Sequence, residues 1–275
     1  MEAETPCCDD RPDLLQQLAG WFRRQRGHVV PQRAADIVAG RVVPTDSRRA
    51  AAAEGAGRCW PRVAVLLMPA LLLSAARPAW AQNGWIVEVA GGFALNVPTR
   101  LTIRQAGQPD ISLTAHYDGR SFASPLYYAV RIGRWARGRG WEVELIHHKL
   151  YLQNPPSEVQ QFDVSHGFNL VSVNRAIAIG GTIVRPGVGL VLTHPENVVR
   201  GQALSQSRGL LGWGYYLSGP MAQLAVARRF HAWDRLFIAA EGKVTAAYAR
   251  VPVQEGSATL SNVAFHGLLG VGYGW

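Results

Sequence analysis

Apolar and polar residues alternate with a period of two along most of the chain from Gly84 onward. The clearest segment is 236–248, where apolar or small residues occupy every second position and Glu241 and Lys243 lie between them. Successive side chains of a strand point to opposite faces, whereas a helix would place Glu241 and Val244 on one side. The pattern therefore predicts strands with one apolar and one polar face.

The alternating segments have the length of transmembrane strands, which need about 9–11 residues. They predict an all-β protein: a closed antiparallel up-and-down transmembrane β-barrel, in which ten strands are favoured. The expected segments are 84–95, 99–105, 110–117, 126–135, 140–151, 167–178, 182–194, 219–230, 235–249 and 258–275.

Connection lengths support this count. With both barrel ends in the periplasm, the inner connections are short and four of the five outer ones are longer, as is typical of such barrels. Eight strands remain an alternative if 99–105 and 167–178 belong to loops. Segment 167–178 is the weakest, because Arg175 shares a face with Val171 and Val173, and a bulge there would reset the register.

The inward positions carry charges of both signs. A barrel this narrow is largely filled by side chains, and buried charges are costly unless they are paired or hydrated. We therefore expect an internal salt-bridge network that holds the barrel shut, with a polar passage for a small solute as the alternative. The predicted lumen residues are Glu88, Arg100, Arg131, Glu142, Glu144, Arg185, Arg229, Glu241 and Lys243.

The last eleven residues place apolar side chains at alternate positions and end on an aromatic residue. This resembles the carboxy-terminal signature of bacterial outer-membrane β-barrels, without indicating a subfamily. The resemblance implies a Gram-negative outer membrane with its lipid and lipopolysaccharide, and periplasmic chaperones and the barrel-assembly machinery as partners in biogenesis. It also implies that Trp275→Ala impairs assembly more than a change at Gly274. The expected signature residues are Phe265, Leu269, Val271, Tyr273 and Trp275.

The segment before the barrel has the features of a targeting sequence. An apolar run at 63–76 follows Arg58 and Arg62 and precedes small residues that end at Ala81. A membrane-spanning helix needs about 20 apolar residues, so this run favours a signal peptide for the general secretion route, cleaved near Ala81. We expect a signal peptide at 58–81 and a barrel at 82–275. Residues 1–57 are expected to form a poorly ordered extension, unless the start site has been assigned too far upstream.

The charge, the cysteine positions and the glycine-rich stretches argue against several other classes of function. The net charge is +9, but the arginines of the barrel are dispersed among apolar strands, which argues against nucleic-acid binding. All three cysteines, Cys7, Cys8 and Cys59, precede the cleavage point, so a disulfide framework or cysteine metal site is not expected in the barrel. Glycine-rich stretches lack the strand–helix context of a phosphate loop, and we expect neither cofactor nor metal.

One region, 147–175, departs from clean alternation and carries several polar residues. We favour a patch that contacts lipopolysaccharide phosphates. A metal site formed by His147, His148 and His166 is disfavoured, because neighbouring strand residues diverge. A hydrolase is the other alternative, in general architecture similar to lipid A deacylases and acyltransferases but without a matching motif. Its candidate residues are Ser165 as nucleophile, His148 or His166 as base and Asp163 as orienting group.

We therefore expect an integral outer-membrane barrel of narrow lumen with a structural, sensing or lipid-interacting role. The first alternative is an outer-membrane lipid A or phospholipid acyl hydrolase or transferase that uses region 147–175. The second is a soluble periplasmic ligand-binding barrel, which would have an apolar lumen and a polar exterior, the reverse of the placement expected for Glu241 and Lys243.

Overall fold

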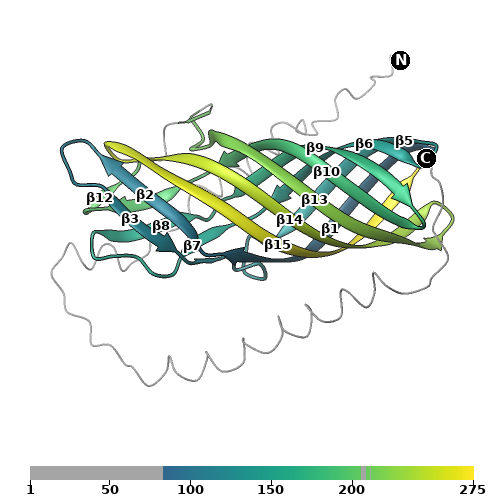
Figure 1. The fold of residues 1–275 in the computed structure, drawn as a ribbon, viewed down its shortest axis with the longest axis horizontal. Coiled ribbons are helices and arrows are strands. Elements are labelled where there is room, and N and C mark those ends of the chain that lie inside the picture. Colours follow the sequence, from purple (N-terminus) through teal and green to yellow (C-terminus); the bar gives the residue numbers. More distant parts are fainter. Residues whose placement is uncertain (1–82, 206–208, 211) are drawn as a thin grey trace, which may run out of the picture. The chain divides into compact units, whose positions relative to one another are not determined.

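The computed structural model describes residues 83–205, 209–210 and 212–275 (Figure 1). The expected extension and signal peptide lie outside the described residues. Within the described residues the regular elements are β-strands, and no helix there is long and apolar enough to cross a membrane.

Eight antiparallel strands form a closed ring, because β1 pairs with both β5 and β15 (Figure 1). Each ring strand is bonded to two neighbours, so the ring leaves no free edge along its length. The predicted closed up-and-down barrel is confirmed. In ring order the strands are β1 (Gly84–Val97), β5 (Tyr128–Ala136), β6 (Arg139–His147), β9 (Phe168–Ile179), β10 (Thr182–Thr193), β13 (Tyr216–Trp233), β14 (Leu236–Val253) and β15 (Gly256–Gly274).

The favoured ring of ten strands was wrong, because β2 (Thr99–Gln105) continues β1 outward instead of returning. Along β15, pairing with β1 reaches Val97 and pairing with β2 resumes at Leu101. Between them lies Pro98, which has no N–H to donate to the ladder. Connection 106–109, expected at the inner end, is therefore an outer turn.

After that turn the chain returns through β3 (Ile111–Ala115), which pairs with β2. Segment 167–178, the weakest expected strand, is ring strand β9. Its register with β6 and β10 is unbroken, so no bulge resets it. Arg175 instead lies on the outer wall, with its guanidinium 5.0 Å from the ring centroid of Trp141. A long cationic side chain can cover apolar surface while its charge reaches a polar layer.

The barrel has two different ends. Backbone hydrogen bonds between Trp85 and Trp275 place both ends of the barrel chain together, beside the short turns at 137–138, 180–181 and 234–235. We call this the inner end, and the opposite one the outer end. Strands β13, β14 and β15 have 18, 18 and 19 residues. A transmembrane strand needs about 9–11 residues, so these three strands are much longer than that. The barrel wall is therefore longer at the outer end than membrane-spanning strands require.

This outer extension contains a second sheet of five short strands. Its side chains Phe162 and Val164 share one buried apolar core with Leu101, Val251 and Leu260 of the main sheet. The extension is therefore filled by an apolar core rather than by solvent. The strands, in sheet order, are β12 (Gln202–Ala203), β11 (Glu196–Val199), β8 (Val159–Val164), β7 (Leu150–Leu152) and β4 (Tyr117–Asp118).

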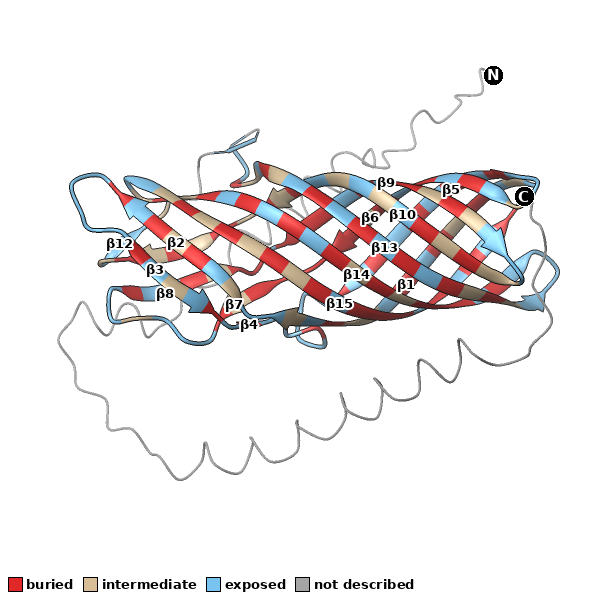
Figure 2. Cartoon of the chain, viewed as in Figure 1, coloured by how far each residue is buried: buried red, intermediate tan, exposed pale blue. Residues whose placement is uncertain are grey.

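Buried and exposed residues alternate along the ring strands (Figure 2). The exposed positions of the ring are mostly apolar, whereas the buried positions at the same level carry charge. This placement contradicts the soluble barrel with a polar exterior. We call the exposed apolar side chains of the ring the apolar belt; they include Val89, Val130, Ile132, Val143, Val173, Val188, Leu190, Leu224, Val226, Ile238, Phe265, Leu269 and Val271.

Candidate functional sites

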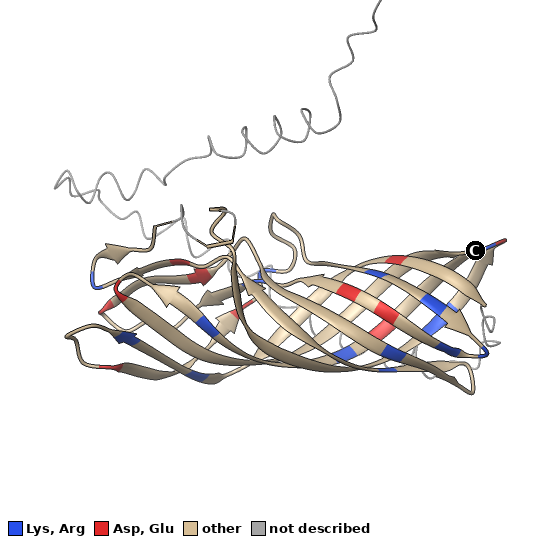
Figure 3. Ribbon diagram, turned by 90° about the horizontal axis from the view of Figure 1, so that it is seen from above, with Lys and Arg blue, Asp and Glu red and all other residues tan. Residues whose placement is uncertain are grey.

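Eight charged side chains meet inside the ring, four acidic and four basic. All are buried, and the ribbon shows both signs close together on neighbouring strands in the half of the barrel that holds the C-terminus (Figure 3). Charges of both signs in equal number can neutralise one another where water is scarce. We call this set the luminal charge network; its members are Glu88, Arg131, Glu142, Glu144, Arg185, Arg229, Glu241 and Lys243.

Arg131 is the most connected member of the network. Its guanidinium donates hydrogen bonds to Glu88 at 2.7 Å, to Glu144 at 2.6 Å and to Glu241 at 2.9 Å. Arg185 completes a second bridge, because it donates to Glu241 at 2.7 Å and to a carboxylate of β6 at 2.8 Å. Hydrogen bonds of this kind, between two ionised groups, are the strong ones in proteins.

The network spans the whole width of the lumen. Strands β14 and β6 lie four places apart in the ring of eight, on opposite walls, and Lys243 of β14 donates to Glu144 of β6. Gln223 of β13 donates to the same carboxylate at 2.7 Å. Side chains from opposite walls thus touch at this level, so the lumen is occupied there.

Two further layers enclose the charges. Towards the inner end, Trp135 belongs to a small buried apolar cluster, and Phe237 fills the space beside Gly272. A Cβ on Gly272 would lie 2.1 Å from the Phe237 ring, so a larger residue there would displace the aromatic side chain. Towards the outer end, His266 bonds the Tyr127 hydroxyl at 2.9 Å and Thr245 at 2.8 Å. Of the expected lumen residues, Arg100 alone is exposed, because β2 lies beyond the ring.

The region 147–175 does not form one exposed basic patch. His147 is buried and bonds Asn169 at 2.8 Å, and the buried Lys149 ammonium donates to the Ala123 carbonyl at 2.8 Å. His148 bonds Asn96 at 3.0 Å inside the barrel wall. These three side chains satisfy internal acceptors and donors rather than facing a lipid surface.

Ser165 and His166 lie together at the outer end, around a carboxylate that the sequence did not indicate. The Ser165 hydroxyl donates to Glu196 Oε2 at 2.7 Å, and His166 Nδ1 lies 2.7 Å from Glu196 Oε1. This hydrogen bond raises the pKa of His166 and lowers the pKa of Glu196. We call Ser165, His166, His194 and Glu196 the outer rim cluster.

The outer rim cluster lacks the order of a hydrolase triad. In such a triad the imidazole stands between the hydroxyl and the carboxylate and accepts the hydroxyl proton. Here the hydroxyl of Ser165 donates to the carboxylate itself, and its distance to His166 Nδ1 is 3.3 Å. Asp163 does not orient His166: it accepts a hydrogen bond from Gln161 at 2.9 Å, and burial raises its pKa.

The two members missed from the sequence are His194 and Glu196. His194 follows β10 and Glu196 begins β11, about 30 residues from Ser165, and they reach it because β11 pairs with β8. The one local signal was the His-Pro-Glu spacing, which puts two metal-ligating or acid–base side chains two residues apart.

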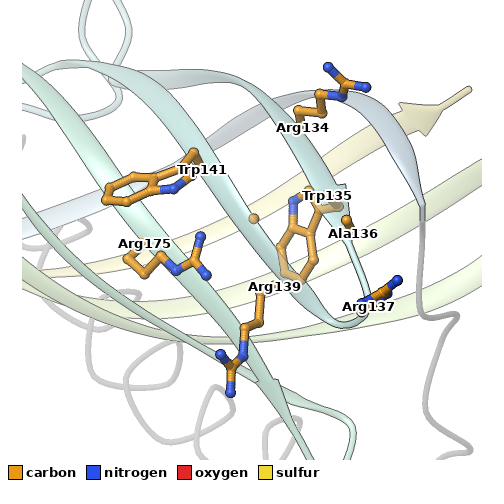
Figure 4. A pocket seen from close by; sticks show the side chains of 8 residues that line it. Arg134, Trp135, Ala136, Arg137, Arg139, Trp141 and Arg175 are labelled. Carbon is orange, nitrogen blue, oxygen red and sulfur yellow. The ribbon is translucent and has the colours of Figure 1, made fainter.

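A third site is a pocket at the inner end of the barrel, formed by residues of β5, β6 and β9 (Figure 4). Its lining combines positive charge with the exposed indole of Trp141, whereas the indole of Trp135 points into the barrel and donates to Glu142. No ion pair joins its arginines to a carboxylate among the described residues, in contrast to the paired arginines of the lumen. We call it the inner rim pocket; it is lined by Arg134, Trp135, Ala136, Arg137, Arg139, Gly140, Trp141 and Arg175.

The C-terminal signature residues all lie on the outer face of β15. Each is exposed, next to the apolar belt, and their assembly role stays a prediction. They are Phe265, Leu269, Val271, Tyr273 and Trp275.

These features define the class of protein. An eight-stranded closed barrel with an apolar exterior, a polar lumen, short turns at one end and long excursions at the other is a transmembrane β-barrel of the outer-membrane type.

Solved structures similar to the chain are small barrel proteins. Outer membrane protein AlkL in lipid bilayers is 14% identical, with 74% of this chain and 95% of that chain covered and a TM-score of 0.40. Neisserial surface protein A is 10% identical over 71% of this chain and 100% of its own, with a TM-score of 0.35. Outer membrane protein OprG from Pseudomonas aeruginosa is 10% identical over 70% and 98%, with a TM-score of 0.32. No protein-family model and no curated protein sequence matches the chain.

Proposed function

We propose that the protein is a non-conducting integral protein of a Gram-negative outer membrane, with a structural and lipid-interacting role. The observation that supports this most strongly is the luminal charge network, because Lys243 and Glu144 join opposite walls of the ring. A porin lumen is instead wide and water-filled. In this proposal the inner end faces the periplasm and the outer extension projects from the cell.

Planar-bilayer recording tests the non-conducting role. Insertion is first established by the shift in gel mobility between boiled and unboiled protein, and the boiled sample serves as the control for contaminating channels. We expect no stepwise conductance from the folded protein. Regular ohmic steps from the folded protein, absent from the boiled control, would overturn the proposal.

The inner rim pocket supports the lipid-interacting part. Four arginines without a described carboxylate partner lie around the exposed ring of Trp141 at the edge of the apolar belt (Figure 4). Arginine binds phosphate through several N–H groups, and tryptophan prefers the membrane interface. We infer that this pocket holds the phosphate of an anionic phospholipid of the periplasmic leaflet.

Native mass spectrometry of protein purified in detergent with phosphatidylglycerol tests this inference. We expect the Arg134→Gln/Arg139→Gln variant to retain about tenfold less lipid than wild type, because two charge-assisted contacts are lost. The matched control is Arg100→Gln/Arg250→Gln, which removes two exposed arginines from the outer extension. Equal loss in both variants would show that net charge, and not the pocket, holds the lipid.

A further inference from the structure

We propose that His166, His194 and Glu196 form a binding site for a divalent transition-metal ion, with Zn²⁺ as the reference ion. Each residue offers one ligand atom, and the three atoms lie within 4.8 Å of one another. Zn²⁺ bonds of about 2.0–2.2 Å in tetrahedral geometry separate ligand atoms by roughly 3.3 Å. Small side-chain rotations therefore bring the three atoms to one ion.

The backbone holds the two contributing connections together. The His194 amide donates to the Gly167 carbonyl at 3.0 Å, which ties the connection after β10 to the one after β8. The Tyr215 hydroxyl donates to the His166 carbonyl at 3.3 Å and its ring stands edge-on to His194. His194 and Glu196 are two residues apart, the spacing that directs extended side chains to one side. The ligands thus converge on a frame that does not depend on the ion.

A hydrogen-bonded neighbour orients the carboxylate. Ser165 donates to Glu196 Oε2 at 2.7 Å, which leaves Oε1 directed at His166, also at 2.7 Å. An ion at this point would take the place of the direct contact between His166 and Glu196. Partners of this kind, bonded to a ligand rather than to the ion, fix ligand orientation and commonly change metal affinity by about 10–100-fold.

The donor set indicates the kind of ion. Two imidazoles and one carboxylate suit Zn²⁺, Cu²⁺ or Ni²⁺, whereas Ca²⁺ and Mg²⁺ prefer oxygen ligands alone. The His166 side chain is 59% exposed, so the ion can enter from the outer side and a water molecule can complete the coordination. These ligands differ from the set His147, His148 and His166 that the sequence suggested, because His147 and His148 are buried elsewhere.

The experiment uses untagged full-length protein folded in detergent and freed of metal with a chelator. Co²⁺ is added as a spectroscopic probe, and Zn²⁺ is then titrated in competition. We expect one Co²⁺ per chain, with visible absorption bands of four-coordinate cobalt that Zn²⁺ abolishes. His166→Gln and Glu196→Gln should each weaken Zn²⁺ binding by about a hundredfold or more, since each removes a ligand. Ser165→Ala should weaken it by about tenfold with unchanged stoichiometry.

The matched control is His116→Gln, which removes an exposed histidine of the same extension that lies outside the cluster. It should bind Zn²⁺ as wild type does. Heat-dependent gel mobility shows that each variant is folded, and His166→Gln alters a largely exposed side chain. Absence of stoichiometric binding to wild type, or equal affinity in wild type and both ligand variants, would show that the cluster is only a hydrogen-bonded ion pair.

Discussion

The interior of the barrel contains two regions of opposite chemistry that are built from the same strands. Along the inward face of β14, Glu241 and Lys243 belong to the luminal charge network, whereas Val251 and Val253 belong to the apolar core of the extension. The outward face changes in the opposite sense, from the exposed Ile238 to the exposed Arg250 on the same strand. The two faces therefore exchange polarity within one continuous strand.

Strand β15 repeats this exchange at the same height. Its outward side chains are apolar from Val263 to Tyr273 and polar at Ser257, Thr259 and Ser261. Tyr248 of β14 pairs with Ser261 of β15, so the change occurs at one level on both strands. This level marks the outer boundary of the apolar belt.

The difference follows from what surrounds each region. Where lipid covers the wall, the apolar side chains contact lipid on the outer face, and hydrogen-bonded charges can hold the lumen together. Where water covers the wall, stability requires apolar side chains to be buried inside. One fold thus uses electrostatic packing in the membrane and hydrophobic packing beyond it.

The largest effect should come from breaking the charge network. Arg131→Met leaves three carboxylates without their shared partner, and removal of one partner from a buried ion pair costs about 3–5 kcal/mol. Urea unfolding in lipid vesicles, followed by tryptophan fluorescence, measures this loss. The control is Arg250→Met on the exposed face of the extension.

The double variant Arg131→Met/Glu144→Gln sharpens this test. It restores equal numbers of acids and bases, so it should recover part of the stability lost by Arg131→Met. If the double variant is less stable than the single one, charge balance does not explain the inner region.

A smaller effect is expected in the apolar region. Leu260→Ala leaves a cavity in the core of the extension, because Leu260 is fully buried, and such changes cost about 2–5 kcal/mol. We expect protease cleavage of the outer sheet to accelerate while the boiled-versus-unboiled gel shift persists. Thr259→Ala, on the outward face of the same strand, should change stability by less than about 0.5 kcal/mol. Loss of the gel shift in Leu260→Ala would show that the two regions do not fold separately.

The sequence predicted the membrane region well because its alternation keeps one phase. On its own strand, each of the inward charges Glu88, Glu142 and Glu241 lies between outward apolar residues. The spacing alone therefore predicted that all three side chains face the lumen. The extension was missed for the same reason. After Tyr248 the apolar positions shift by one, to Ala249 and the two valines that follow, and the expected strand ended there although β14 continues.

The outer rim cluster was only half predictable. Ser165 and His166 are adjacent in sequence, but their partner Glu196 approaches through the pairing of β11 with β8, which has no local pattern. The candidate base His148 is buried, because the chain after β6 turns its ring into the barrel, beside His266. Contacts between connections that are distant in sequence depend on tertiary pairing, which the alternation of apolar and polar residues does not predict.

The smallest effects should come from single arginine substitutions along the outward face. The change in their cost in unfolding free energy from one position to the next locates the boundary between the two regions. An arginine on the lipid face costs about 2–4 kcal/mol at the membrane midplane and about 0–1 kcal/mol near the interface. Leu269→Arg, near the middle of the apolar belt, should therefore be the most destabilising, Tyr248→Arg slightly destabilising and Thr259→Arg neutral. Unfolding in vesicles gives the three values under one condition. Equal costs at Leu269 and Thr259 would contradict a lipid boundary at Tyr248, because one solvent would then surround both regions.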